Sequence, residues 1–414
     1  MAEFSLKKIN TCTFIAAITA ITVVNGAVQK HTFSLGNIYY AILITILALT
    51  FFQSPIKRLS YAMSLLYITC ILSIVANVIP PEYRAWERFT LFVIVTFIAS
   101  PFIQSNFFDK FRIITFKYIQ YLLIAVIVLS IPAFVTGERG TTGFEGFTSH
   151  SMIISSVAAM VIMTLVYLFY SKKLSKKIII PLLVLSFPML LLGASRIALA
   201  GCFCSLLFFF YKINKSNIAQ FMKVTIAVVV LLGATYPIWN TYLSGIETKN
   251  AAIDEETGEV DLTSSRNVLW EQRLKEFQSS PAVGIGFCYA PYVASIDKDT
   301  GKIEFADTDT GMIEPGSGWL GILSMTGLFG LLCIVAIWIR SFYMCAKMER
   351  KDFYFSIYLS SLLVFYTIQM IAEGGIYSAG GFDCFIIWIL LGAIQASWNI
   401  TNSRNSKNIV NEKG

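Results

Sequence analysis

Charged and metal-binding side chains are scarce in this sequence. Only 14% of its 414 residues are Asp, Glu, Lys or Arg, and it has two histidines, His31 and His150. It has no Cys-x-x-Cys pair and no histidine at metal-ligand spacing from a cysteine. These scarcities argue against a soluble domain and predict no metal site and no cofactor.

Apolar residues, by contrast, are abundant. Hydrophobic residues make up 56% of the chain and the mean hydropathy is +0.67, more apolar surface than one soluble core can bury. A helix needs about 20 mostly apolar residues to cross the hydrocarbon layer, and alternating strands of the outer-membrane type are absent. The sequence therefore predicts an all-α fold, a polytopic membrane bundle of about 12 transmembrane helices. The twelve candidate spans are 10–28, 37–53, 60–80, 88–106, 116–136, 149–171, 178–194, 196–212, 222–243, 318–340, 353–371 and 382–399.

The basic residues predict the orientation of this bundle. If the N-terminus is cytoplasmic, the segments on the cytoplasmic side hold 21 of the 32 Lys and Arg residues. Cytoplasmic loops of membrane proteins are enriched in these residues. We therefore expect an even number of spans with both termini in the cytoplasm. The net charge of +7 then reflects topology and not nucleic-acid binding.

One long polar segment divides the membrane helices. Residues 1–243 hold the first nine spans, 244–317 form a loop of about seventy residues on the outer face, and 318–414 hold the last three spans and a tail. A connection of this length is usually functional or disordered.

The second half of this loop predicts a helix. Ser264 and Ser265 offer an N-cap, and Trp270, Leu274 and Phe277 then fall on one face of the helix that follows. We expect this amphipathic helix to rest on the bundle or on the membrane surface.

Arg196 stands where one span turns tightly into the next at the outer boundary. One reading is that its side chain reaches the lipid interface, as arginines near span ends do. The other is that it binds an anion. Ser195 is a plausible N-cap for the span that follows, so the helix N–H groups point the same way as the guanidinium. A phosphate there would be bound both by the helix N–H groups and by the Arg196 guanidinium.

Four short motifs follow one another along the chain. Their order, spacing and placement on a twelve-span chain resemble the O-antigen ligase and polymerase superfamily over about residues 140–335. The motifs are Ser195-Arg196 at the head of a span, Ser265-Arg266-x-x-x-Trp270 in the long loop, Phe277-x-x-x-Pro281-x-x-Gly284-x-Gly286 after it, and Trp319-Leu320 followed by Thr326-Gly327-x-x-Gly330.

The resemblance implies a metal-independent, GT-C-like membrane glycosyltransferase in a bacterial inner membrane, with its active site facing the periplasm. Such enzymes take a glycan from undecaprenyl pyrophosphate and transfer it to a sugar hydroxyl of a glycan or lipid A-core acceptor. By this resemblance Arg196 and Arg266 grip the pyrophosphate, because arginine donates two parallel hydrogen bonds at any pH. Arg273 follows Arg266 by seven residues and projects to nearly the same side, so it is a further candidate for substrate binding.

One departure from the family pattern concerns the base. Where ligase members and many polymerases have His-Asn before the aromatic-Leu pair, this chain has Gly316 and Ser317. Two candidates could replace the histidine. His150 lies at the head of a span and is otherwise a capping residue. Glu314 lies at the bilayer edge, where desolvation would raise its pKa, although a Glu before Pro-Gly is also typical of a solvated loop.

Three further residues are candidate substrate contacts near the outer edge. Glu373 could line a path for sugars. Trp319 could stack on a sugar ring or belong to the aromatic belt of the interface. Ser317 occupies the position where the family pattern has the Asn of His-Asn.

Three functions remain open at this point. The missing histidine favours a polymerase of O-antigen or exopolysaccharide repeat units, and the alternative within the family is an O-antigen ligase. A transporter of lipid-linked oligosaccharides is the alternative from another class. It should carry ionisable or helix-breaking residues at mid-membrane depth, and the predicted spans carry almost none.

Overall fold

The computed structural model describes residues 11–51, 53–138, 140, 143–215, 219, 222–223, 252–253, 260–261, 264–289, 295–296, 303–304 and 316–411. The described part is almost entirely helical, and its strands are two residues long. The elements are α1 (Thr11–Val28), α2 (Asn37–Phe51), β1 (Arg58–Leu59), α3 (Tyr61–Val75), η1 (Pro81–Tyr83), α4 (Ala85–Ala99), β2 (Ile103–Gln104), α5 (Asn106–Leu129), α6 (Ile131–Thr136), α7 (Ser151–Tyr170), α8 (Lys176–Leu192), α9 (Arg196–Ile213), β3 (Ala252–Ile253), β4 (Val260–Asp261), α11 (Ser264–Ser279), β5 (Ser295–Ile296), β6 (Ile303–Glu304), α12 (Gly318–Met348), α13 (Phe353–Ala372), η2 (Gly375–Tyr377) and α14 (Phe382–Asn411).

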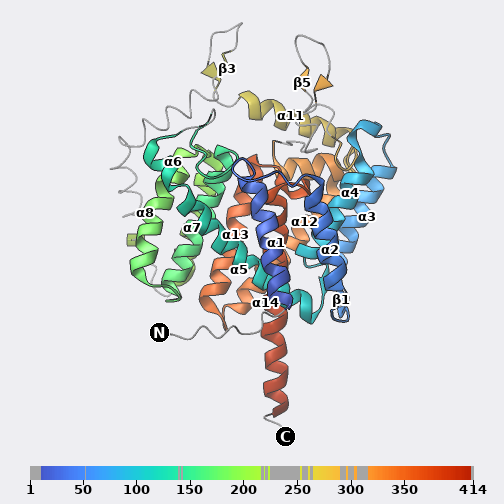
Figure 1. Ribbon diagram of the computed structural model, residues 1–414. Helices are drawn as coiled ribbons and strands as arrows, with labels where there is room; N and C mark the ends of the chain where they lie inside the picture. The colour runs from blue at the N-terminus through green and yellow to red at the C-terminus, as the bar shows by residue number, and fades with distance from the viewer. Residues whose placement is uncertain are drawn as a thin grey trace.

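The apolar helices form one upright bundle (Figure 1). Helix α11 lies across one end of the bundle, which we call the loop face. The turns 193–195 and 373–381 also lie at this face. Helix α14 extends from the opposite end, the tail face, where turns 171–175 and 349–352 lie. The start of α1 lies at the tail face as well. The two ends of the described chain therefore share one side of the bundle, and the cytoplasmic position of that side stays a prediction.

Eleven of the twelve predicted spans coincide with helices, and the twelfth, 222–243, lies outside the described residues except for 222–223. The all-α, polytopic fold is thus confirmed. In the described part of the chain, seven helices are long and apolar enough to cross a membrane. Helices α2, α3 and α4 have 15 residues each, short of the ~20 that a full crossing needs. The total of about twelve crossings stays a prediction.

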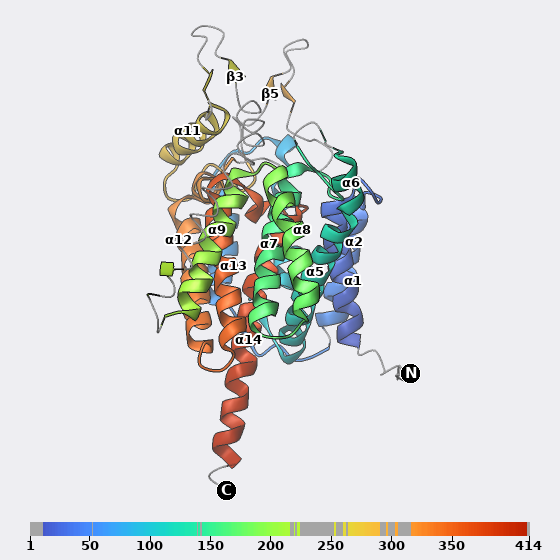
Figure 2. The same cartoon turned by 90° about the vertical axis from the view of Figure 1, so that its left-hand side faces the viewer.

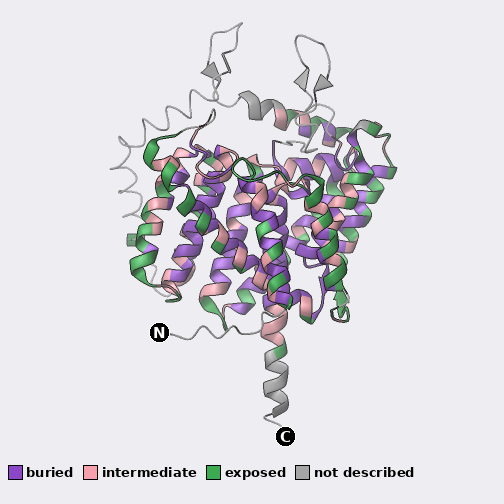
Figure 3. Cartoon of the chain, viewed as in Figure 1, coloured by how far each residue is buried: buried purple, intermediate pink, exposed green. Residues whose placement is uncertain are grey.

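Burial separates central from peripheral helices (Figure 3). Most span residues of α7 and α14 are buried inside the bundle, 83% and 78% of them, against 28% in α9. Helix α3 exposes Leu65, Ile68 and Leu72 at helical spacing. Such an apolar outer surface fits lipid and would be unfavourable in water.

Arg112 illustrates how the tail face is held together. Its side chain is 0% exposed, and it donates hydrogen bonds to three carbonyls, those of Phe97 (3.2 Å), Ile98 (3.0 Å) and Ile103 (2.6 Å). Two of these carbonyls belong to the last turn of α4, whose C=O groups have no partner within the helix. Arg112 is therefore a cap for α4 and not an exposed basic residue of the tail face.

We expect Arg112→Met to destabilise the protein by about 3 kcal/mol or more, because the charge-assisted hydrogen bonds are lost and buried carbonyls are left unpaired. Thermal unfolding in detergent and the yield of folded protein would measure this. The control is Lys110→Met on the exposed side of the same helix, expected to change stability by less than about 0.5 kcal/mol. Equal losses in both variants would contradict the capping role.

Candidate active site at the loop face

Helix α12 begins at a serine cap. Ser317 is 2% exposed; its Oγ accepts from the Leu320 N–H (3.3 Å) and donates to the Met370 carbonyl (3.2 Å). Trp319 donates through Nε1 to the Thr367 carbonyl at 3.0 Å. Both side chains therefore fasten α12 to α13, and contact with a substrate through them stays a prediction.

Helix α9 begins at Ser195, as the sequence predicts. The Ser195 Oγ accepts from the Ala198 N–H at 3.3 Å, and Ala194 before it has a left-handed backbone with φ 59°, so the turn from α8 is tight. Arg196 is the first residue of α9 and is exposed. Its place at the head of a helix on the loop face is the one predicted for an anion-binding arginine.

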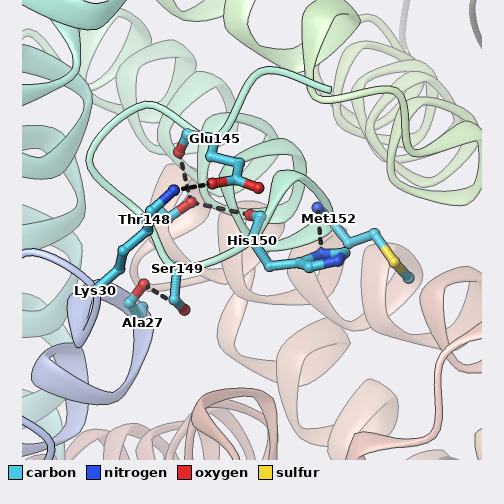
Figure 4. Close-up of polar contacts among 7 residues, drawn as sticks. All are labelled: Ala27, Lys30, Glu145, Thr148, Ser149, His150 and Met152. Atoms are coloured by element: carbon cyan, nitrogen blue, oxygen red, sulfur yellow. Dashed lines mark hydrogen bonds and ion pairs between the residues drawn. The ribbon is translucent and has the colours of Figure 1, made fainter. Parts of the chain in front are cut away.

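His150 caps α7 (Figure 4). Its Nδ1 accepts from the Met152 N–H at 3.2 Å. In the neutral ring the proton is then on Nε2, so the only nitrogen that can accept a proton already serves the helix. This geometry fits the capping interpretation of His150 and makes it a poor general base.

The segment before His150 is docked on the turn between α1 and α2 (Figure 4). Lys30 pairs with Glu145 at 2.5 Å, and the Ser149 N–H donates to the Ala27 carbonyl at 2.9 Å. The Thr148 hydroxyl donates to the Glu145 carbonyl at 2.7 Å. These contacts fix the entry into α7.

Three helix N-termini meet around the end of α13. A Cβ at Gly193, just before α9, would lie 2.8 Å from the Ser151 carbonyl at the head of α7. A Cβ at Gly318, at the head of α12, would lie 3.0 Å from the carbonyl of Glu373, which follows α13. Figure 2 shows the ends of α7, α9, α12 and α13 at the same face.

Helix α9 sets the level of Arg196 relative to α13. Gly201 packs closely on Phe365, and the two helices run in opposite directions (Figures 1 and 2). Arg196 lies five residues before Gly201, which is roughly 7.5 Å nearer the loop face. The head of α9 is therefore beside the last turn of α13, and the structure brings Arg196 and Glu373 to the same region.

The electrostatics of this region favour an anion. Each helix N-terminus carries unpaired N–H groups and a partial positive charge of about half an elementary charge. Arg196 adds a full charge at one of the three. Helix N-termini with an adjacent arginine are well suited to phosphate groups.

Helix α11 confirms the predicted helix in the loop, but its buried face differs from the predicted one. Leu274 is 43% exposed, whereas Arg273 and Glu276 are 0% and 2% exposed. Trp270 donates through Nε1 to the Gly316 carbonyl at 3.1 Å. The charged pair is inside because each charge neutralises the other, which hydrophobic periodicity alone cannot reveal.

Arg273 faces α12. Its Nη2 lies 2.9 Å from the Glu276 Oε1, and its Nη1 donates to the Ser324 Oγ at 3.3 Å. The guanidinium is enclosed by protein, and contact between Arg273 and a substrate stays a prediction. Glu276 and Ser324 were not among the residues predicted from the sequence; the opposite charges of Arg273 and Glu276 at i, i+3 were the available signal.

The carboxyl of Glu276 titrates near neutral pH. Burial raises its pKa to about 7, and Arg273 draws it down in part. Because this value lies above the 4.5 of an unburied glutamate, stability should fall as pH rises from about 4.5 to about 7, by at most ~3 kcal/mol. We expect Glu276→Gln to remove this part of the pH dependence of Tm in detergent. The exposed Glu271→Gln on the same helix should leave it in place, and an identical profile for both would contradict the assignment.

Two glycines of the family motifs hold the segment after α11 against a break in α12. Gly327 has φ 64° and ψ −164° inside α12, and the N–H groups of Leu328 and Phe329 donate to the carbonyls of Pro281 (2.8 Å) and Ala282 (3.3 Å). A Cβ at Gly284 would lie 2.4 Å from the backbone carbon of Met325. The glycine motif therefore fastens the backbone after α11 to the backbone of α12. The sequence of the motif alone did not show this role.

Several predicted features lie outside what the structure describes. Glu314 is among the residues that are not described, and Arg266 lies in the first turn of α11 with a side chain that is not described. Both enzyme functions also require a cavity between α11, α9 and α12 that opens sideways to lipid, and this cavity stays a prediction. A hollow lined by Trp86, Arg84 and Asn77 lies instead at the turn between α3 and α4.

The fold and the loop face define a polytopic α-helical membrane protein with several helix N-termini at one site. Among the residues described, no three His, Cys, Asp or Glu side chains gather as a metal site requires. Residues 181–335 match the family model described as O-antigen ligase. The match confirms the resemblance to the O-antigen ligase and polymerase superfamily over this part of the chain. No curated protein matches the chain. The matched region contains α9, α11 and the head of α12.

Proposed function

We propose that the protein is a periplasm-facing glycosyltransferase of a bacterial inner membrane that moves a glycan from undecaprenyl pyrophosphate to a sugar hydroxyl. The observation that carries the proposal is that the heads of α7, α9 and α12 lie around the end of α13 on one face, with Arg196 at the head of α9. Two of these three helix heads lie in the matched region.

The reaction requires charge stabilisation. The acceptor oxygen attacks the anomeric carbon, the bond from that carbon to the pyrophosphate oxygen breaks, and negative charge grows on the leaving group. Arg196 and Arg266, together with the helix N–H groups, would stabilise that charge without a metal ion. Each arginine can hold two oxygens at once.

The proton of the acceptor hydroxyl needs a base. His150 is engaged with the backbone of α7 through Nδ1, which leaves Glu314 as the preferred candidate. A partly desolvated carboxylate at the bilayer edge would have a pKa suited to this role. Glu373 would then contact the sugar, since a carboxylate accepts hydrogen bonds from hydroxyl groups.

We propose polymerisation of O-antigen or exopolysaccharide repeat units as the particular reaction. The support is the absence of a histidine at the head of α12, where Gly316 and Ser317 stand in place of the His-Asn that ligase members and many polymerases have. Transfer to a lipid A-core acceptor by a ligase is the alternative within the superfamily.

A lipid-linked oligosaccharide transporter remains the alternative from another class. The break at Gly327 and the prolines inside α8 are helix-breaking features of the kind a transporter uses. The break at Gly327, however, is filled by the backbone of residues 281–285 and does not line an open path. This contact favours a static structural role for the break.

A deletion strain complemented with wild type, Arg196→Ala, Arg266→Ala or Glu314→Gln tests these functions through its glycan profile, with membrane levels of each variant checked. Single repeat units on the acceptor would support a polymerase, and long chains accumulating on the carrier would support a ligase. Lipid-linked units trapped on the cytoplasmic side would support the transporter and contradict the proposed site.

A further inference from the structure

Helix α11 is joined to α12 at three points. Before the head of α12, Trp270 donates to the Gly316 carbonyl. After α11, the backbone of 281–285 bonds to α12 around its break. Between these two points, the Arg273–Glu276 pair faces Ser324. The pair is therefore the middle anchor of the helix.

Burying this ion pair has a large desolvation cost in free energy. Both side chains are at most 1% exposed. Within the described structure, the Arg273 Nε and Nη2 donate no hydrogen bond of good geometry and both carboxylate oxygens of Glu276 accept none, although Nη2 lies 2.9 Å from Oε1. A well-packed apolar pair in place of a buried ion pair is often neutral or stabilising. Stability alone does not explain why this pair is here.

An ion pair differs from an apolar contact in how narrowly it defines position. Two charges enclosed in protein must face each other and a polar partner at a short distance, whereas an apolar face tolerates sliding. Ser324 provides that partner on α12. The pair therefore sets the register of α11 along α12.

The register of α11 decides where its first turn lies. The turn that contains Arg266 is seven residues before Arg273, about 10.5 Å along the helix. Next to that turn, Leu269 packs against Gly316, where an added Cβ would lie 2.8 Å from the Leu269 Cβ. A shift at the anchor would move this turn relative to the head of α12.

We propose that Arg273 and Glu276 form a positioning pair that fixes α11 on α12 and so holds the Arg266 turn beside the head of α12. The proposal rests on the proposed glycosyl transfer for its effect on activity. Its geometric part, the register of α11, does not depend on that reaction.

The geometric part is tested by a disulfide between Leu269→Cys and Gly316→Cys, formed by oxidation of purified membranes. Single-cysteine variants serve as controls for the native cysteines. In this background we compare the intact pair with the double variant Arg273→Met/Glu276→Leu, which removes both charges and keeps similar volume. We expect the cross-linked fraction to fall at least fivefold while the level of folded protein is kept.

Activity is measured with the same variants in the complemented strain. The double variant should reduce glycan transfer at least tenfold. Glu276→Gln, which keeps the size of the side chain and should fold, is expected to lose at least threefold in both cross-linking and transfer. Wild-type cross-linking or wild-type transfer in either folded variant overturns the proposal.

The two proposals fail in different ways. If Arg196→Ala abolishes transfer while the double variant matches wild type, the positioning role is wrong and the function stands. If the double variant loses the cross-link but Arg196→Ala transfers glycan normally, the positioning of α11 stands and the proposed site is wrong.

Discussion

Arg196→Ala is expected to lower glycan transfer by about 100- to 1000-fold without lowering the amount of folded protein. Removing one preorganised group that stabilises a developing oxyanion typically has this effect on turnover. Arg196 is exposed at the head of α9 and is not part of the buried core, so truncation should leave the fold intact. Arg196→Lys should give a transfer rate between those of wild type and Arg196→Ala. Lysine keeps the positive charge but cannot donate two parallel hydrogen bonds as arginine does. Transfer is measured as glycan chain formation per amount of membrane protein.

The matched control is Arg84→Ala. Arg84 is also an exposed arginine at the head of a loop-face helix, α4, and its side chain is 70% exposed. It lies outside the region that matches the family. We expect transfer within about twofold of wild type, as for most surface substitutions. Similar activity for Arg84→Ala and Arg196→Ala would remove the main support for the proposed site.

Gly284→Ala is expected to prevent α11 from docking. The new Cβ would lie 2.4 Å from the carbonyl carbon of Met325 and 2.5 Å from the Thr326 nitrogen. Both are backbone atoms that cannot move aside as a flexible side chain can. Overpacking costs ~1–3 kcal/mol where the surroundings relax, so we expect a larger loss here. The measurements are Tm in detergent and the fraction of monodisperse protein.

Gly137→Ala is the control that separates clash from backbone strain. Gly137 has φ 70°, close to the 76° of Gly284, but nothing lies within 4 Å of an added Cβ. The left-handed backbone alone costs an alanine ~1–2 kcal/mol. Gly137→Ala should therefore lower Tm by a few degrees at most, and Gly284→Ala by clearly more. Equal decreases in Tm for the two variants would mean that the contact between Gly284 and the backbone of α12 is not closely packed.

The apolar runs were sufficient to predict the bundle. Length and hydropathy placed eleven helices because a span must satisfy its backbone internally and therefore follows hydropathy closely. The boundaries were less accurate. The predicted span 318–340 continues as α12 to Met348, and 116–136 is divided into α5 and α6 at Ser130, since polar ends of helices leave no hydropathy signal.

The helix heads were predictable from local chemistry. A serine before a span marks a cap, so Ser195 and Arg196 were placed correctly at the start of α9. The buried face of α11 was not predictable in the same way. Arg273 and Glu276 are inside because they neutralise each other beside Ser324, and this depends on α12, which is distant in sequence.

The role of the glycine motif needed the structure as well. Gly284 and Gly327 are 43 positions apart, and their close approach follows from how residues 281–285 dock on the break in α12. Spacing along the chain carries no information about such a contact. The base of the proposed reaction is a different case, because Glu314 stays a prediction from the sequence.

The most direct test of glycosyl transfer is a reconstituted assay in liposomes with a labelled, undecaprenyl-pyrophosphate-linked repeat unit. We predict that the wild-type protein releases undecaprenyl pyrophosphate in step with the formation of longer glycans, and that Arg196→Ala releases almost none. Movement of the intact lipid-linked unit between the two leaflets, with no release of undecaprenyl pyrophosphate, would contradict glycosyl transfer and support a transporter.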